Sequence, residues 1–158
     1  MNGTISAVRR HSTAAAHGIK PMDKLLAVNG KVPADLVELS YLLAEESIEL
    51  VVEDSAGVKR TIVINKALDE DLGLEFETAV FDGVRQCHNN CVFCFVEQML
   101  PNMRKSLYER DDDYRLSFLY GNFLTLTNLQ DEDYERIIKS HLSPLYVSVH
   151  ATDPSIRQ

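Results

Sequence analysis

The strongest constraint on this chain is the spacing of its cysteines, Cys87, Cys91 and Cys94, which form the pattern Cys-x3-Cys-x2-Cys. The 158-residue sequence has no other cysteine, and an odd number confined to one segment argues against a secreted disulfide framework. Three thiolates this close in sequence can bind one metal centre, with zinc, copper(I) or an iron–sulfur cluster as candidates. The same positions also share one face of a helix, as small buried side chains would, but Asn89 and Asn90 favour a loop.

Two kinds of metal site remain open. A structural zinc ion needs four protein ligands. His88 would have to strain to join the tetrahedron of its neighbour Cys87, and His141 and His150 would have to be brought in by the fold. A cubane iron–sulfur cluster bound by three cysteines instead leaves one iron open, where a substrate or cofactor can chelate. The predicted metal ligands are the same three cysteines in both cases.

Composition places the chain among soluble globular proteins and argues against two classes of partner. Hydrophobic residues make up 45% and charged residues 25% of the sequence, which is ordinary for a globular domain. The 16 Lys and Arg residues against 24 Asp and Glu residues give a net charge of −8, which disfavours nucleic-acid binding by bulk charge. No apolar run reaches the roughly 18 residues of a transmembrane helix, and the N-terminus lacks the apolar region of a signal peptide. We therefore expect a cytoplasmic protein that does not enter the membrane.

Residues 1–76 predict a small, mainly-β domain. Alternating or β-branched runs indicate strands at residues 5–9, 25–28, 48–53 and 58–64. Asn29-Gly30 favours a type I′ turn, and residues 54–57 have the composition of a second hairpin turn. Asp35 is a predicted N-cap, followed by apolar residues at helical spacing over residues 36–43.

Residues 77–158 predict alternating strands and helices. The expected strands lie at residues 76–81, 116–120, 123–126 and 145–149. A short helix is expected over residues 95–99, ended by Pro101, and a longer one from an N-cap at Asn128 to Leu142. This order indicates a parallel α/β arrangement. The run of aspartates at 111–113 lacks the glycine and late glutamate of a calcium loop and predicts a solvated turn.

The cysteine spacing, with the aromatic Phe93 directly before the third cysteine, resembles the signature of radical S-adenosylmethionine (SAM) enzymes. Further segments resemble one bacterial family more closely, at residues 82–98, 106–108, 110–118 and 148–154. That family joins an N-terminal PDZ-like domain to a radical SAM barrel and a C-terminal region of uncharacterised function. The implied fold class is α/β plus a small mainly-β domain. A PDZ-like domain is expected at residues 1–76, and the first part of a partial (β/α)6 barrel at residues 77–158.

The resemblance implies a radical SAM enzyme, oxidoreductase-like, whose substrate the sequence does not identify. The three cysteines would bind a [4Fe–4S] cluster, with the amino and carboxylate groups of SAM on the fourth iron. An electron donor would drive cleavage of SAM to a 5′-deoxyadenosyl radical, which abstracts a substrate hydrogen. Phe93 is expected to bring its backbone near the adenine. In the superfamily a Gly-Gly-Glu segment holds the methionine amino group, and the corresponding place here looks like Gly121-Asn122, without a glutamate. A simple turn at Gly121-Asn122 and core packing of Phe93 are the other interpretations.

The N-terminal segments His17-Gly18-Ile19 and Met22-Asp23 resemble a PDZ domain, with Met22 where that family usually has glycine. Four residues resemble its carboxylate-binding loop, displaced as in a circular permutation: Leu72, Gly73, Leu74 and Phe76. The resemblance implies that a peptide C-terminus adds as a strand beside residues 74–76; a packing module that binds no free peptide is the other interpretation. The alternative from another functional class is a non-catalytic, PDZ-like peptide- or partner-binding module with a zinc or vestigial cysteine loop.

The resemblance ends before the barrel of that family is complete. Such a barrel has about six strand–helix units, whereas residues 77–158 have room for roughly three. We therefore expect a truncated sequence whose intact parent is the radical enzyme. The piece is expected to hold the cluster loop without turning over.

Overall fold

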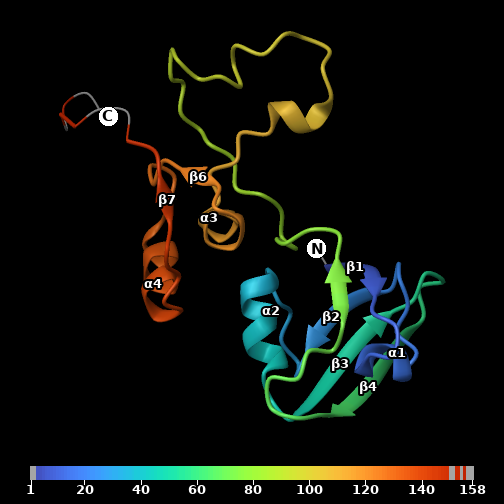
Figure 1. Cartoon of the computed structure of the whole chain (residues 1–158). Helices are drawn as coiled ribbons and strands as arrows, with labels where there is room; N and C mark the ends of the chain where they lie inside the picture. The colour runs from blue at the N-terminus through green and yellow to red at the C-terminus, as the bar shows by residue number, and fades with distance from the viewer. Residues whose placement is uncertain (1–2, 150–151, 154, 156–158) are drawn as a thin grey trace. The chain divides into compact units, whose positions relative to one another are not determined.

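The computed structural model of the chain describes residues 3–149, 152–153 and 155 and divides into two compact units, Met1–Gly83 and Val84–Gln158. The first unit is built on an antiparallel sheet and the second on a pair of parallel strands. The chain is therefore a mixed α/β protein with few helices (Figure 1). Over the described ranges, every helix is too short or too polar to cross a bilayer.

Five strands form the sheet of the first unit, and every neighbouring pair is antiparallel. In chain order they are β1 (Gly3–Val8), β2 (Lys24–Val28), β3 (Ser47–Glu53), β4 (Lys59–Asn65) and β5 (Leu74–Phe76). Their order across the sheet is β4-β3-β2-β1-β5, which leaves β4 and β5 at the two edges. The four strands predicted before residue 65 are confirmed.

Both predicted turns of this unit are confirmed by their backbone geometry. Asn29 and Gly30 have φ angles of 50° and 74°, the left-handed pair that a type I′ turn requires. In the β3–β4 hairpin, the Asp54 carboxylate accepts hydrogen bonds from the backbone N–H groups of Ala56 and Val58, both at 2.9 Å. Local side-chain chemistry therefore sets the register of this hairpin.

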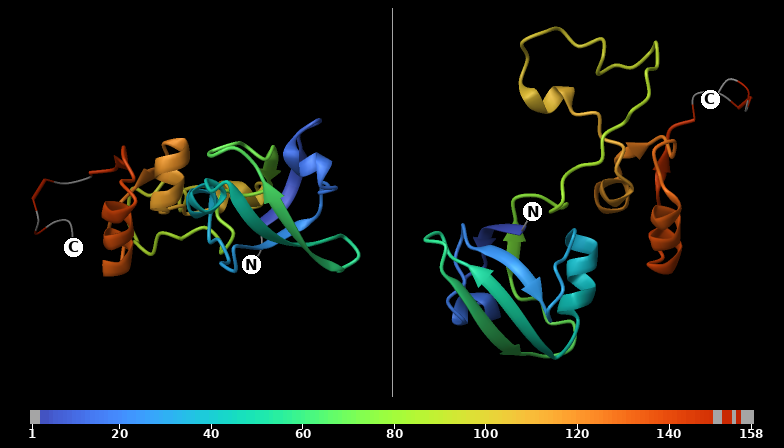
Figure 2. Two further views of the ribbon diagram at one scale, coloured as in Figure 1. Left: turned by 90° about the horizontal axis from the view of Figure 1, so that it is seen from below. Right: turned by 180° about the vertical axis from the view of Figure 1, so that it is seen from behind.

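Two helices complete the first unit, α1 (Thr13–Ala16) and α2 (Leu36–Leu43). Asp35 caps α2 as predicted, because its carboxylate accepts the backbone N–H of Glu38 at 2.9 Å. The Glu38 carboxylate in turn accepts the N–H of Ala34 at 2.9 Å. Figure 2 shows α2 beside the sheet from two further directions, and its Leu39 is buried in the core of the unit.

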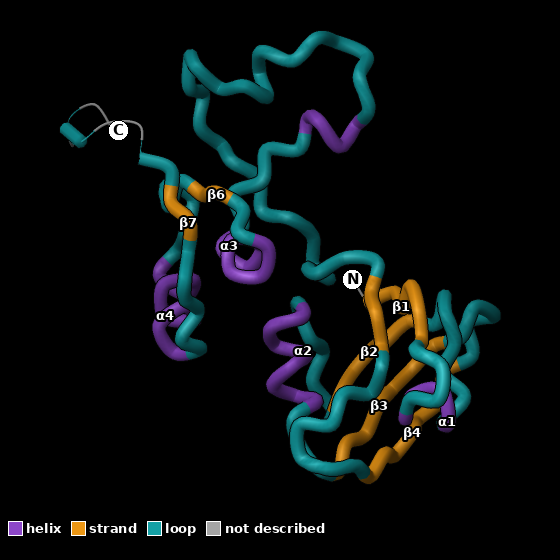
Figure 3. The backbone as a smooth tube through the Cα atoms, in the orientation of Figure 1, coloured by secondary structure: helices purple, strands orange, loops and turns teal. Residues whose placement is uncertain are grey.

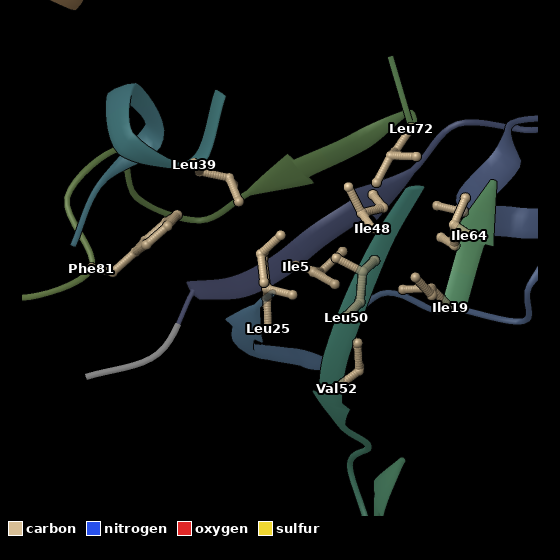
Figure 4. Packing of buried hydrophobic residues seen from close by; sticks show 12 residues of the cluster. Ile5, Ile19, Leu25, Leu39, Ile48, Leu50, Val52, Ile64, Leu72 and Phe81 are labelled. Atoms are coloured by element: carbon tan, nitrogen blue, oxygen red, sulfur yellow. The ribbon is translucent and has the colours of Figure 1, made fainter. Parts of the chain in front are cut away.

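The core of the first unit is apolar and draws on β1 to β4, and β5 packs against it with partly buried side chains. Its buried members include Ile5, Ile19, Leu25, Leu39, Ile48, Leu50, Val52, Ile64, Leu72 and Phe81 (Figure 4). Along β3, Ile48, Leu50 and Val52 are at most 1% exposed, which is the alternation expected of a strand with one buried face. Hydrophobic burial is therefore the main term that holds this unit together.

The predicted strand over residues 76–81 is wrong beyond Phe76, where β5 ends. The chain instead turns back to run beside the start of α2. The N–H of Leu36 donates to the Ala79 carbonyl at 2.9 Å, and the N–H of Phe81 donates to the Ala34 carbonyl at 2.7 Å. Phe81 is 3% exposed and belongs to the core. The first compact unit extends to Gly83.

The second unit contains one strand–helix–strand motif and a long loop. Its elements are the 3-10 helix η1 (Lys105–Tyr108), α3 (Tyr114–Tyr120), β6 (Phe123–Leu124), α4 (Asp131–Lys139) and β7 (Tyr146–Val147). Strands β6 and β7 pair in parallel, so the predicted parallel order is confirmed for this pair. Figure 3 shows that most of the chain between β5 and α3 is loop.

Two predicted elements of the second unit are wrong, and the predicted helix at α4 is present but has a different cap. Residues 116–120 form α3 rather than a strand, because Asp113 caps the helix at its start and Gly121, with φ 77°, ends it in the left-handed conformation. Helix α4 is capped by Gln130 and not by Asn128. Residues 95–99 form turns without a regular helix.

Candidate functional site

The three cysteines line a single cavity of about 510 Å³ within the second unit. Each thiol is free and half-buried. Phe93 and Asn122, two of the predicted cofactor-binding residues, line the same cavity. The fold therefore brings together residues from the cysteine loop and from the start of β6.

The cavity lies where the two parallel strands end. Thr125 directly follows β6 and Ser148 directly follows β7, and both line it. The N–H of Ser148 donates to the Leu124 carbonyl at 2.8 Å, which continues the pairing of the strands to this point. In open α/β sheets, ligands bind outside the carboxyl ends of parallel strands. The cysteine cavity thus has the position of a ligand site.

Arg110 holds the cysteine loop from two sides. Its guanidinium forms an ion pair with Glu97 at 2.7 Å and donates a hydrogen bond to the Asn89 carbonyl. Its backbone carbonyl accepts the N–H of Cys87 at 2.6 Å. Within the described ranges, the buried Nε of Arg110 has no hydrogen-bond partner. A positive charge with unused donor capacity therefore lies in the cavity wall.

Two residues of the aspartate run at 111–113 are buried and hydrogen-bonded to several partners, so the prediction of a solvated turn is wrong. Asp112 and Asp113 are only 2% and 1% exposed. The Asp112 carboxylate accepts the backbone N–H and hydroxyl of Thr125 at 2.6 and 2.8 Å, and the Asn128 amide at 2.5 Å. Sequence reasoning missed these residues because their partners lie farther along the chain and no local pattern marks them.

Asp113 serves helix α3 instead. It accepts the backbone N–H of Arg115 and forms a bidentate pair with the buried Arg115 guanidinium at 2.9 and 2.7 Å. It also accepts the backbone N–H of Arg85 at 3.1 Å. Burial by itself would raise the pKa of Asp113, but the Arg115 side chain and the Arg85 N–H hold that pKa below its usual value. The carboxylate is therefore charged at neutral pH despite its burial.

A second polar cluster surrounds Tyr114, which is fully buried. The Arg85 guanidinium lies over its ring at 5.2 Å from the centroid and forms an ion pair with Asp133. The Tyr114 hydroxyl accepts a hydrogen bond from Arg136 at 3.4 Å. Burial raises the pKa of Tyr114, against the lowering effect of the nearby Arg136 and Arg85 charges. This cluster links the chain before the cysteines to α4.

Asn122 and Gly121 have different surroundings. The Asn122 amide donates to the Asp111 carboxylate at 2.6 Å, and both side chains line the cysteine cavity. Gly121 is not among the described residues that line it. A Cβ on Gly121 would lie 3.5 Å from the Tyr146 ring, so its place is explained by the end of α3 and the packing beside β7.

Among the described residues, His88 and His141 form no metal-binding group with the thiols. His88 lines a separate cavity of about 420 Å³ with Arg85 and Asn128, and His141 lies just beyond α4. His150 lies outside the described residues. Within the ranges that the structure covers, no three His, Cys, Asp or Glu side chains are arranged to hold one metal ion.

The predicted peptide-binding residues lie in the first unit, at and before its edge strand. Leu72 is buried in the core, and Leu74 and Phe76 are half-buried ends of β5. Gly73 has φ 77°, and a Cβ there would come within 2.5 Å of the Ser12 side chain. Its N–H already donates to the Asp71 carboxylate at 2.7 Å.

Comparison with known proteins assigns the chain to a family. Residues 66–158 match the radical SAM-like domain, a range that contains the cysteine motif and every residue of the cysteine cavity. No curated protein matches the chain. The family match covers more than half of the sequence. The chain therefore belongs to the radical SAM-like domain family.

Proposed function

We propose that the chain binds a [4Fe–4S] cluster through Cys87, Cys91 and Cys94 and forms the cluster-binding part of a radical SAM enzyme. One observation carries this proposal. The three thiols line one cavity at the carboxyl ends of β6 and β7, where parallel sheets bind their ligands. The family match over residues 66–158 supports the same assignment.

The charge near the thiols suits an iron–sulfur cluster, in which each iron takes its own thiolate. A cluster on three thiolates is anionic, and the Arg110 guanidinium in the cavity wall offsets that charge.

The cavity wall also has groups suited to a SAM molecule. When bound together, the cluster and SAM would supply one-electron chemistry that ends in a 5′-deoxyadenosyl radical able to take a hydrogen atom from a substrate. Asp111 and Asn122 offer a carboxylate and an amide for the polar end of an amino acid. Phe93 lies in the same wall and is 54% exposed. The substrate and the electron donor would approach this same cavity.

Metal and sulfide analysis after anaerobic purification and reconstitution tests the proposal. We expect about four irons and four sulfides per chain, and their loss in Cys91→Ala. Val92→Ala is the matched control, because Val92 belongs to the same loop and is 94% exposed. Stoichiometric zinc bound in place of iron would contradict the proposal and favour the non-catalytic binding module.

We also propose that the first unit is a PDZ-like domain that binds a peptide C-terminus along β5. The supporting observation is that β5 is an edge strand, paired with β1 on one side, and an edge strand can accept a further strand. The apolar side chains of Leu74 and Phe76 are only half-buried there. The Asp71 carboxylate occupies the N–H of Gly73, so a peptide carboxylate would have to displace it.

Peptide binding is tested with a pool of mixed-sequence peptides that end in a free apolar residue. We expect chemical-shift changes in the backbone amides of residues 74–76 with this pool and not with the same pool amidated at its C-terminus. Asp71→Asn, which weakens the internal competitor, is expected to strengthen the binding. Equal shifts with both pools would rule out carboxylate recognition.

A further inference from the structure

We infer that Asp112 is a positioning residue for the cysteine loop. Its buried carboxylate sets the conformation of His88 and Asn89, which lie between the first two thiols, and thereby sets how Cys87 and Cys91 face the cavity. The consequence for metal binding rests on the proposed function. The effect of Asp112 on the conformation of the loop does not rest on it.

Asp112 joins segments on both sides of the cysteine loop. Its backbone N–H donates to the Arg85 carbonyl at 3.0 Å, two residues before Cys87. Its carboxylate, 2% exposed, takes hydrogen bonds from Thr125 and Asn128 in the segment that follows β6. A buried carboxylate with three such bonds is held in one orientation.

Both partners of Asp112, Asn128 and Thr125, connect its carboxylate to the cysteine loop through hydrogen bonds. The Asn128 amide nitrogen donates to Asp112 at 2.5 Å, which leaves its oxygen to accept the backbone N–H of His88 at 3.3 Å. This chain of hydrogen bonds through Asn128 is the first arm, and the chain through Thr125 is the second. In the second arm, the Asn89 amide donates to the Thr127 hydroxyl at 2.7 Å. That hydroxyl meets the Thr125 hydroxyl at 2.7 Å, and the Thr125 hydroxyl donates to Asp112 at 2.8 Å.

The direction of these bonds depends on a group that only accepts. An ionised carboxylate has no donor, so every amide and hydroxyl in both arms points its hydrogen toward Asp112. An amide at position 112 would keep its oxygen on the N–H of Thr125 and place its nitrogen against Asn128. Two donors would then face each other, the Asn128 amide would turn over, and its nitrogen would meet the N–H of His88. The hydrogen bond from the His88 N–H to Asn128 would be lost, although asparagine has nearly the same shape as aspartate.

The other buried aspartates do not form this connection to the loop. Asp113 binds Arg115 and caps α3. Asp133 binds Arg85 and accepts the N–H of Gln130 at the start of α4. Asp133 is also buried, at 5% exposure, so Asp133→Asn is a matched control for the loss of a buried carboxylate in this unit.

The experiment compares the wild-type chain with Asp112→Asn, Asn128→Asp, the double variant that carries both changes, and Asp133→Asn. The double variant exchanges the amide and the carboxylate, so the new amide donates to the new carboxylate, whose other oxygen accepts the N–H of His88. The first readout is hydrogen exchange of the His88 backbone amide in the metal-free protein. The second is bound iron and sulfide after anaerobic reconstitution.

We expect Asp112→Asn to speed exchange at His88 by about tenfold, the effect of losing one hydrogen bond. Asn128→Asp should have a similar effect, because its carboxylate is repelled by the carboxylate of Asp112. Both single variants should lower bound iron severalfold. The double variant should return both values to within about twofold of the wild type, and Asp133→Asn should leave exchange at His88 unchanged. Recovery in the double variant is a result that a general loss of stability would not produce.

Each other outcome is informative. If the double variant remains as impaired as Asp112→Asn, or if Asp133→Asn has the same effect at His88, the inference about Asp112 is overturned. If the wild type binds iron and Asp112→Asn binds the same amount, positioning of the thiols is overturned while the proposed function stands. If the wild type binds no iron but exchange at His88 follows the expected pattern, the proposed function fails and the structural role of Asp112 stands.

Discussion

The two units of this chain are stabilised by different kinds of interaction. The first is an antiparallel sheet around an apolar core, in which Ile5, Leu25 and Leu50 are at most 1% exposed. In the second unit the largest fully buried side chains include Arg115 and Tyr114, and Asp112 and Asp113 are buried beside them. The first unit therefore depends on hydrophobic burial, and the second on the pairing of buried charges and hydrogen bonds. The unit that carries the candidate site is the one whose stability is sensitive to a single lost partner.

The largest effect is expected from Asp113→Ala, which tests the charge pairing of the second unit. Arg115, 1% exposed, would lose its bidentate partner, and breaking a buried pair typically costs about 3–5 kcal/mol. Urea unfolding followed by backbone amide signals should show an earlier transition for residues of the second unit. The signals of β1–β4 should keep their midpoint, as should all signals in the exposed control Asp131→Ala. A joint shift of both units would contradict the comparison.

The reciprocal test is Leu50→Ala in the first unit. Leu50 is fully buried, and truncating a core leucine costs about 2–5 kcal/mol of unfolding free energy. The same amide signals should now show the loss in β1–β4, while iron and sulfide binding by the second unit stays at the wild-type level. Glu49→Ala, on the exposed face of the same strand, is the control. Reduced cluster content in Leu50→Ala would mean that the site needs the first unit intact.

A smaller effect is expected from Gly73→Ala, next to the proposed peptide-binding strand. Gly73 has φ 77°, and its new Cβ would come within 2.5 Å of Ser12. Gly57 has φ 82° with open space around it, so Gly57→Ala measures the backbone strain alone. We expect Gly57→Ala to cost about 1 kcal/mol in thermal or urea unfolding and Gly73→Ala to cost more. Equal costs would show that the Ser12 contact relaxes freely.

The smallest expected effect is the loss of folding stability at acidic pH. The pKa of Asp113 is lowered in the folded protein, so its contribution to stability is complete above its unfolded pKa of about 3.9 and is lost as the pH falls through the folded value. In the first unit, the Gly73 N–H and Arg9 lower the pKa of Asp71, but this pair is exposed. Salt should therefore screen the contribution of the exposed Asp71–Arg9 pair in the first unit, and leave the contribution of the buried Asp113–Arg115 pair in the second unit.

A pH titration of amide signals between pH 6 and pH 2, at low and high salt, measures this difference. We expect the second unit to lose stability on acidification at both salt concentrations. Asp113→Asn should remove that part of the pH dependence. Loss of the effect at high salt would indicate that the Asp113–Arg115 pair is more open to solvent than its burial implies.

The elements that sequence reasoning predicted well are those with local signals. The turn at Asn29-Gly30, the cap at Asp35 and the alternation along β3 each depend on neighbours in the sequence, and all are confirmed. Helix α3 was predicted as a strand, because its run of apolar residues has no clear period and its cap is one of the aspartates assigned to a solvated turn. The cap itself is local, because Asp113 accepts the N–H of Arg115 two residues further on.

The candidate site divides in the same way. The spacing of the cysteines identifies them as one group, and the structure adds that they line a common cavity. The residues that hold the loop, Arg110 and Asp112, could not be predicted, since their partners Glu97, Thr125 and Asn128 have no sequence pattern that pairs them. Such polar networks are set by the fold, and only a view of the fold shows them.

The directional hydrogen bonds around Asp112 also restrict how this region can evolve. A change at position 112 alone, or at position 128 alone, places two donors or two acceptors face to face, whereas the paired change keeps a donor opposite an acceptor. The two positions should therefore covary in related sequences, with aspartate at one accompanied by asparagine at the other. A random mutagenesis library of this chain should likewise recover the two exchanges together and reject each of them singly.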